Sequence, residues 1–157
     1  MQLPNSLTAC FQTQGWTLHP HQLAMLDLAQ NPSTLLIAPT GGGKTLAGFL
    51  PSLCELALGY KGLHTLYISP LKALTADIRR NLRRPVGGAN LPIRIEDRTG
   101  DTTCTQRRRQ RADPPHILLT TDTPPPWSGG GGKYAIPAIL EQVKRHNITL
   151  IFHNTRA

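Results

Sequence analysis

The sequence APTGGGKT, residues 38–45, lies between two apolar runs of different character. The run TLLIA at 34–38 predicts a short buried strand, and the run at 44–58 has the apolar spacing of a helix. Three consecutive glycines let the backbone curl close to a ligand without side-chain clash. The following helix presents the positive end of its dipole. Strand, glycine loop and helix together predict a binding site for the phosphates of a nucleoside triphosphate.

The two residues after the glycines complete this chemistry. Lys44 is expected to neutralise the β- and γ-phosphates, and the Thr45 hydroxyl is expected to ligate Mg²⁺. The strict form of the pattern opens with glycine, whereas this chain has Ala38. The alternative is a glycine-rich turn that precedes Lys-Thr by chance.

Outward from the loop, strands and helices are predicted in alternation. Helices are expected over 21–30, 44–58, 71–84, 102–112 and 136–146. Strands are expected over 34–38, 64–69, 91–97, 116–121 and 148–154. Pro51 is expected to kink its helix, and PVGG at 85–88 is expected to end the helix before it. Because several strands are continuously apolar, the pattern predicts a parallel α/β sheet.

The charge of the chain is strongly positive and is concentrated in one segment. The 157 residues carry 17 Lys and Arg against 9 Asp and Glu, a net charge of +8. Residues 72–111 hold eleven Lys and Arg against four Asp and Glu, which is +7 of that total. This balance favours a polyanionic partner, most often nucleic acid. The alternative is a solvated, arginine-rich surface.

Cysteine usage and hydropathy exclude several classes of protein. Cys10, Cys54 and Cys104 are far apart and form no C-x-x-C pair, which argues against a disulfide framework or a zinc site. No apolar run approaches the roughly 18 residues that span a membrane, and the first residues do not have the pattern of a signal peptide. A reduced, cytoplasmic setting without a membrane partner is therefore expected.

Four further segments, taken with the glycine loop, resemble a known family. They are GWTLHPHQ (15–22), SPLKAL (69–74), RTGDT (98–102) and PPHILLTT (114–121). Over residues 11–121 their order is similar to that in DEXH-box helicases of the large helicase-related (Lhr) type, closest to the ligase-associated repair helicases. The resemblance implies a P-loop, RecA-like α/β fold and ATP-driven movement on DNA in DNA repair, with RNA as the alternative nucleic acid. It also implies a DNA ligase or a nuclease as a repair partner.

The resemblance assigns roles to individual residues. It implies that Gln22 reads the adenine through both ends of its amide and that Lys44 is the catalytic residue; a plain surface glutamine is the alternative for Gln22. Phosphate contacts fall on Thr40, Gly41, Gly42, Gly43, Lys44 and Thr45. Contacts to the nucleic-acid backbone, which position a strand without reading its sequence, fall on Pro70, Lys72, Thr99, Gly100, Asp101, Thr120 and Thr121. Arginines 107–111 either flank the DNA or are simply solvated.

The acidic half of such an active site is missing from the sequence. In the resembled family a D-E-x-H motif holds the metal and orients the attacking water, but this chain has no D-E-x-H sequence. After residue 113 the acids are Asp122 and Glu141. Asp122 is followed by Thr123, so even as a substitute metal ligand it would have no base beside it. The sequence therefore predicts phosphate binding with little or no hydrolysis.

The segment 122–133, rich in proline and glycine, divides the chain. Residues 1–121 resemble part of a first RecA-like domain. Residues 134–157, together with PWSG at 126–129, resemble the start of the second. A flexible linker is the alternative for 122–133. An incomplete first lobe leaves an exposed strand edge, where 148–154 is a candidate to pair in place of the missing acidic strand.

Three hypotheses follow. The first is an internally deleted and truncated DEXH-box DNA helicase that binds ATP and nucleic acid but is inactive alone. The second is a sequence-independent nucleic-acid-binding module with no working nucleotide site. The third is a non-functional gene fragment.

Overall fold

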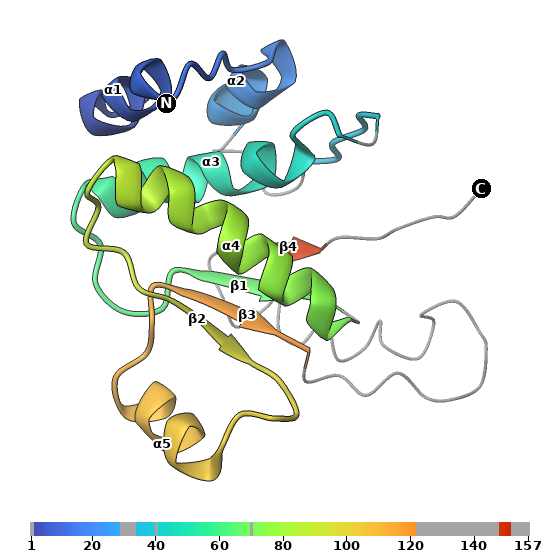
Figure 1. Cartoon of the computed structure of the whole chain (residues 1–157), viewed down its shortest axis with the longest axis vertical. Helices are drawn as coiled ribbons and strands as arrows, with labels where there is room; N and C mark the ends of the chain where they lie inside the picture. The colour runs from blue at the N-terminus through green and yellow to red at the C-terminus, as the bar shows by residue number, and fades with distance from the viewer. Residues whose placement is uncertain (1, 29–33, 40, 70, 122–147, 152–157) are drawn as a thin grey trace. The chain divides into compact units, whose positions relative to one another are not determined.

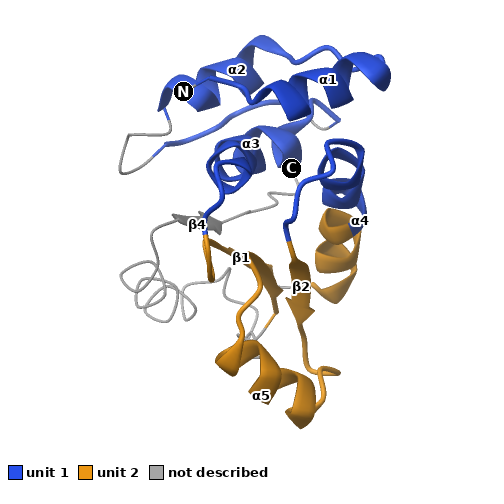
Figure 2. Cartoon of the chain, turned by 90° about the vertical axis from the view of Figure 1, so that its left-hand side faces the viewer, with its two compact units in different colours: residues 1–60, 80–93 blue, residues 61–79, 94–157 orange. Residues whose placement is uncertain are grey.

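The computed structural model describes residues 2–28, 34–39, 41–69, 71–121 and 148–151 of the chain. Figure 1 shows its helices and strands in chain order, and they divide between two compact units (Figure 2). One unit comprises residues 1–60 and 80–93, and the other comprises residues 61–79 and 94–157. The helices are α1 (Asn5–Thr13), α2 (Pro20–Asp27), α3 (Lys44–Ala57), α4 (Lys72–Gly88) and α5 (Cys104–Ala112). The strands are β1 (Thr65–Ile68), β2 (Ile95–Arg98), β3 (Ile117–Thr120) and β4 (Ile148–Ile151).

The second unit is built on a four-stranded sheet with the strand order β2-β3-β1-β4. Every ladder is parallel: Thr65 of β1 pairs with Ile117 of β3 on one side and with Ile148 of β4 on the other. Ile95 of β2 pairs with Ile117 in the same way. The predicted parallel α/β sheet is therefore confirmed, and the predicted strand 148–154 is confirmed over Ile148–Ile151.

The strands β1 and β3 are buried along their whole length, as the continuous apolar runs predict. Leu66, Ile68 and Leu118 form one core cluster, with Leu63 packed against it. Burial raises the pKa of Tyr67 on the same strand, so this phenol stays neutral at ordinary pH. A four-residue strand buried on both sides provides a rigid base for the residues that follow its carboxyl end.

The first unit is helical in its described part. The long helix α3 buries Phe49, Leu50 and Leu53 completely, and α2 and α3 pack against each other. Burial raises the pKa of the Cys54 thiol on α3 to about 11, which keeps it protonated and unreactive. The helix α1 was not predicted, although its buried residues Leu7, Cys10 and Phe11 have helical spacing.

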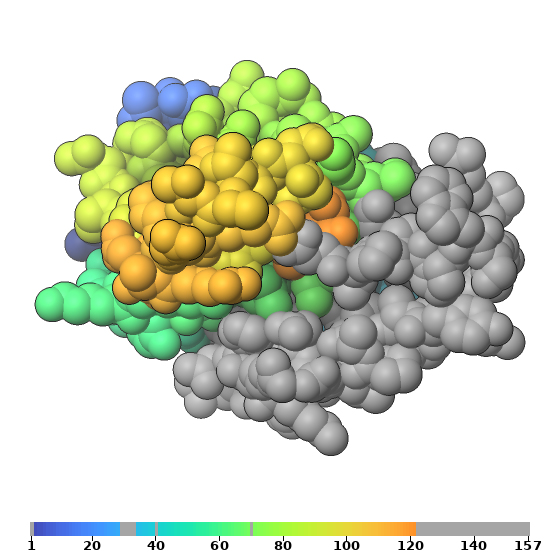
Figure 3. Space-filling model, turned by 90° about the horizontal axis from the view of Figure 1, so that it is seen from below, coloured from blue at the N-terminus to red at the C-terminus, as the bar shows by residue number. Residues whose placement is uncertain are grey.

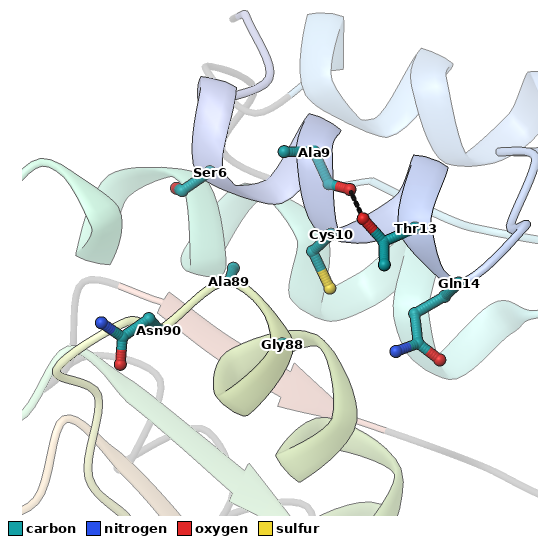
Figure 4. A pocket seen from close by; sticks show the side chains of 8 residues that line it. All are labelled: Ser6, Ala9, Cys10, Thr13, Gln14, Gly88, Ala89 and Asn90. Carbon is teal, nitrogen blue, oxygen red and sulfur yellow. Dashed lines mark hydrogen bonds between the residues drawn. The ribbon is translucent and has the colours of Figure 1, made fainter.

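The end of α1 meets the end of α4 around a hollow of about 280 Å³ (Figure 4). Cys10 points into this contact and its Sγ lies 3.9 Å from the Pro85 carbonyl oxygen. A Cβ on Gly88 would lie 2.5 Å from that sulfur, so a larger residue there would force the Cys10 side chain to shift. The lining carries no charged side chain: it consists of Ser6, Ala9, Cys10, Thr13, Gln14, Gly88, Ala89 and Asn90.

Two predicted boundaries are wrong. Residues 85–88 do not end a helix, because α4 continues through Pro85 to Gly88. Leu82, Pro85 and Val86 are all buried, and this burial outweighs the hydrogen bond lost at the proline. The strand predicted over 91–97 is observed as β2, Ile95–Arg98, so it is shorter and begins later than expected.

The predicted strand 34–38 is also wrong, because the structure gives residues 34–39 no strand pairing within the described chain. Leu35 and Ile37 are each 84% exposed, so apolar composition alone does not bury a strand that lacks a neighbour. The predicted helix 136–146 and the 122–133 segment lie outside the described residues. Within the described residues no helix is both long and apolar enough to cross a bilayer.

Candidate functional site

The glycine loop has a backbone that only glycine adopts easily. Gly41 and Gly43 have φ values of +82° and +70°, in the left-handed region. A Cβ on Gly43 would collide with the amide nitrogen of Gln22, and one on Gly42 would lie 3.0 Å from the Pro39 carbonyl oxygen. Both the backbone angles and the close neighbours therefore favour glycine at these positions, and phosphate binding by the loop stays a prediction.

The first turn of α2 holds the loop by its carbonyl groups. The Gln22 side chain donates from Nε2 to the Gly43 oxygen at 3.1 Å, and the His21 Nε2 lies 2.7 Å from the Gly42 oxygen. The Gln22 Oε1 accepts from the backbone N–H of His19 at 2.8 Å, which closes a capping box. Since two carbonyls are turned toward α2, the loop is anchored on the side away from its amide groups.

The side-chain amide of Gln22, which is expected to read the adenine, already makes hydrogen bonds within the protein. Gln22 is 3% exposed, and both ends of its amide already bond within the protein. A primary amide carries two donor hydrogens and two acceptor lone pairs, so one of each remains for a base. The contact of Gln22 with the loop is therefore the interaction that the structure contains, and adenine recognition stays a prediction.

Lys44 is the first residue of α3, directly after the left-handed Gly43. Its Nζ donates to the carbonyl oxygens of Ala38 at 2.6 Å and Pro39 at 2.9 Å. The amine therefore folds back onto the first residues of the glycine loop. The N–H groups of a first helical turn lack partners inside the helix and favour an anion. Thr45 follows on the same turn, whereas Thr40 lies outside the described residues.

The residues predicted to contact nucleic acid lie in the second unit, at the carboxyl ends of its strands. Gly100 follows β2 by two residues, Thr120 ends β3, and Lys72 begins the helix after β1. Backbone bonds tie these ends together: Ser69 N–H donates to the Thr120 oxygen at 3.0 Å, and Thr121 N–H donates to the Arg98 oxygen at 3.1 Å. The structure therefore brings the three predicted segments to one edge of the sheet. Pro70 lies outside the described residues.

Within the turn after β2, Thr99 has a different position from Gly100. Thr99 is 8% exposed and its hydroxyl accepts from the Asp101 N–H at 3.3 Å, so it holds the turn from inside. Gly100 is exposed, and a Cβ there would lie 3.8 Å from Lys72 Nζ. Gly100 is therefore accessible to a nucleic-acid strand, whereas the Thr99 side chain is buried in the turn.

Lys72 forms an ion pair with Asp101 at 2.7 Å. The two side chains are 55% and 80% exposed, and ion pairs of that kind contribute roughly 0–1 kcal/mol. A phosphate group could replace the carboxylate at little cost. The sequence indicated that Lys72 and Asp101 belong to one site but did not indicate that they pair.

Sequence reasoning also missed His21 and Arg107. His21 precedes Gln22 on the first turn of a helix, and a second polar side chain at that position was the available signal. Arg107 donates to the carbonyl oxygens of Thr99 at 2.7 Å and Thr102 at 3.1 Å. It was grouped with an arginine run, and nothing in that run distinguishes it from its neighbours.

Comparison with known proteins places the chain in a family. Residues 19–124, more than half of the chain, match the family described as DEAD/DEAH box helicase. The chain belongs to the DEAD/DEAH box helicase family, and its parallel sheet with flanking helices is the RecA-like fold of such proteins.

Individual relatives refine the comparison. The chain is 40% identical over 104 residues to ATP-dependent helicase Lhr-Core protein 2 of Thermococcus barophilus, covering 56% of this chain and 12% of that protein. It is similar to the Mycobacterium smegmatis helicase Lhr, solved bound to ssDNA and AMP-PNP, with a TM-score of 0.67 and 40% identity over 75% of this chain and 17% of that one. The yeast DEAD-box splicing factor Prp28 shares the fold, with a TM-score of 0.74 at 16% identity over 99% of this chain and 45% of that one.

Proposed function

We propose that this chain is part of an Lhr-type DEXH-box DNA helicase that binds ATP and the backbone of a nucleic acid but hydrolyses little or no ATP by itself. The observation that carries the proposal is the glycine loop, anchored by α2 and followed at once by Lys44 on α3. DNA repair, a cytoplasmic setting and a ligase or nuclease partner belong to the same proposal. They are supported only by the likeness to ligase-associated helicases.

The nucleotide part of the proposal rests on how the loop is held. With the carbonyls of Gly42 and Gly43 engaged by α2, the amide groups at the start of α3 are left to face an anion. Lys44 would exchange the carbonyls of Ala38 and Pro39 for the β- and γ-phosphates, gaining charge-assisted bonds. The related Mycobacterium smegmatis helicase was solved with AMP-PNP, which supports the same ligand here.

The metal would arrive with the nucleotide. The Thr45 hydroxyl fits as one oxygen ligand, since Mg²⁺ keeps several waters and takes its remaining ligands from phosphates and a few side chains. The described residues contain no group of three His, Cys, Asp or Glu that would form a ready-made metal site. Asp122, the remaining candidate carboxylate near the sequence of β3, lies outside the described residues.

The nucleic-acid part rests on the edge of the sheet that carries Lys72, Gly100 and Thr121. These groups offer one cation, the exposed backbone of Gly100 and the half-buried Thr121 at the ends of neighbouring parallel strands. Contacts of this kind bind phosphates and sugars rather than bases. Thr99 and Thr120 would act by holding their turns, because each is 8% exposed.

The nucleotide site is tested by titrating a fluorescent ATP analogue with Mg²⁺ into wild type, K44A and K61A. Lys61 is an exposed lysine outside residues 38–45, so K61A removes the same charge without changing the loop sequence. We expect saturable binding by wild type and K61A and a loss of at least about tenfold in K44A, since charged hydrogen bonds contribute roughly 1.5–3 kcal/mol. Equal affinity of wild type and K44A would contradict the proposed site.

A second candidate function is a nucleic-acid-binding module with no working nucleotide site. It is favoured by the net charge of +7 over residues 72–111 and by the bonds that Lys44 already makes to its own loop. This candidate predicts DNA binding that falls steeply with salt and is unchanged in K44A. Saturable ATP binding that disappears in K44A would rule it out. A non-functional fragment would instead show no cooperative melting transition.

A further inference from the structure

The arginines of α5 form two groups with different surroundings. The helix has the sequence CTQRRRQRA and four arginines within five residues. Arg107 and Arg109 bond to the protein, the first to carbonyls of the preceding turn and the second to Glu96 at 2.6 Å. Arg108 and Arg111 are exposed and make no hydrogen bond or ion pair to any residue that the structure describes. Arg107 and Arg109 therefore have a role in holding the helix, whereas no role has yet been given to Arg108 and Arg111.

The inner side of α5 is fixed to β2 by side-chain contacts. Gln110, which is 5% exposed, donates to Glu96 at 3.0 Å and to the Asp97 carbonyl oxygen at 3.1 Å. Its Oε1 accepts from Arg98 at 3.1 Å. With Gln110 and Arg109 both attached to the sheet, the helix is held in one rotation about its axis. The opposite side is thereby fixed in its orientation.

Arg108 and Arg111 lie three positions apart, so they share one face of α5 about 5–6 Å from each other at Cβ. Figure 3 shows α5, in yellow and orange, at the surface of the molecule on this side. A pair of guanidinium groups on a fixed helix loses less freedom on binding than two side chains of a mobile loop. The guanidinium fork is also the side chain best matched to phosphate oxygens.

Nearby carboxylates do not neutralise this face. Glu96 pairs with Arg109, Asp97 with Arg79 and Asp113 with Arg94. Asp101 pairs with Lys72. Because these four acids of the second unit each have a basic partner already, they do not neutralise Arg108 and Arg111 within the part of the chain that the structure describes.

The helix is also joined to the turn that carries Gly100. Arg107 donates to the Thr99 and Thr102 carbonyls, and Thr103 caps the first turn of α5. Nine helical residues extend about 13 Å from that turn, which is long enough to follow a nucleic-acid strand beyond Gly100. The exposed face of α5 therefore continues the contact proposed for Lys72 and Gly100.

We propose that the outer face of α5, through Arg108 and Arg111, binds the phosphate backbone of a single-stranded nucleic acid. This inference rests on the nucleic-acid part of the proposed function and adds a second contact to it. The contact is electrostatic and independent of sequence. If this face bound an acidic protein instead, R108A/R111A would weaken the binding of polyglutamate as much as that of the oligonucleotide.

The test is fluorescence anisotropy of a labelled single-stranded oligonucleotide over a range of salt concentrations with wild type, R108A/R111A and R83A/R84A. Arg83 and Arg84 on α4 are exposed and have no hydrogen-bond or ion-pair partner among the described residues, so that control removes the same charge in the other unit. Losing two phosphate contacts should lower the salt slope of log K by about 1.4 and weaken binding on the order of tenfold at low salt. The control should keep the wild-type slope.

Several results would overturn the inference. An unchanged slope in R108A/R111A, or an equal fall in R83A/R84A, would show that net charge alone matters. An equal effect on the binding of polyglutamate would assign the face to acidic proteins. R108K/R111K should keep most of the slope, and all variants should show the wild-type thermal midpoint. The ATP affinity of R108A/R111A should equal that of wild type, because the α5 face is not part of the nucleotide site. A change in DNA binding with unchanged ATP binding therefore concerns the α5 contact alone.

Discussion

At the scale of residues, the loop depends on two side chains of α2 as much as on its own glycines. His21 and Gln22 engage the carbonyls of Gly42 and Gly43, while Lys44 engages those of Ala38 and Pro39. A loop whose carbonyls are held has fewer conformations to lose when it binds a phosphate. The glycines and Lys44 could be identified from sequence. The contacts of His21 could not, because they depend on how α2 packs beside the loop.

The His21 contact leads to a prediction for ATP affinity. H21A removes the hydrogen bond to the Gly42 oxygen, and a bond of that kind contributes about 1 kcal/mol. We therefore expect about a fivefold weaker Kd in the ATP titration. H21Q retains an N–H donor of similar reach and should bind nearly as wild type does. If H21A and wild type have the same affinity, His21 does not position the loop.

At the scale of elements, buried strands were predictable and unpaired ones were not. The strands β1 and β3 have apolar runs and are buried throughout, as expected. The run at 34–38 is equally apolar, but no described segment pairs with it, and Leu35 and Ile37 remain exposed. Composition reports the tendency of a segment to be buried, whereas pairing depends on which partners are present. The extension of α4 through Pro85 has the same origin, since burial of Leu82 and Val86 was not visible in the local sequence.

The start of β3 carries a pH-dependent contact. The backbone N–H of Arg94 donates to Nδ1 of His116 at 3.0 Å, so that nitrogen must be unprotonated. Burial, then the charge of Arg94, lower the pKa of His116; Asp113 opposes this and His64 adds slightly to it. Because the folded pKa lies below that of the unfolded chain, about 6.5, the contribution to stability is present above that value. It is lost as the pH falls toward the folded pKa.

We therefore expect the urea midpoint of wild type to fall between pH 7.5 and pH 5.5 by more than that of H116N. The asparagine oxygen can accept the same N–H but does not titrate. Asp113, whose pKa is held below its usual value by Arg94, stays ionised throughout this range in both proteins. Equal changes in the two midpoints would show that His116 does not contribute.

At the scale of the whole molecule, the sequence match and the sheet agree: residues 19–124 match the DEAD/DEAH box helicase family, and the described strands form the parallel sheet of a RecA-like fold. No D-E-x-H sequence is present anywhere in the 157 residues. The fold class was predictable because alternating strands and helices have local sequence patterns, whereas the phosphate-binding role of the glycine loop stays a prediction. The addition of β4 beside β1 could be anticipated only from the exposed edge that the sheet would otherwise present.

The central claim is that this chain binds ATP without turning it over, and phosphate release tests it most directly. Purified wild type and K44A would be incubated with Mg²⁺ and ATP, with and without single-stranded DNA, at a protein concentration above the Kd for ATP. The account predicts phosphate release by wild type no faster than by K44A, in either condition, while only wild type retains bound nucleotide. DNA-stimulated release that is present in wild type and lost in K44A would contradict it.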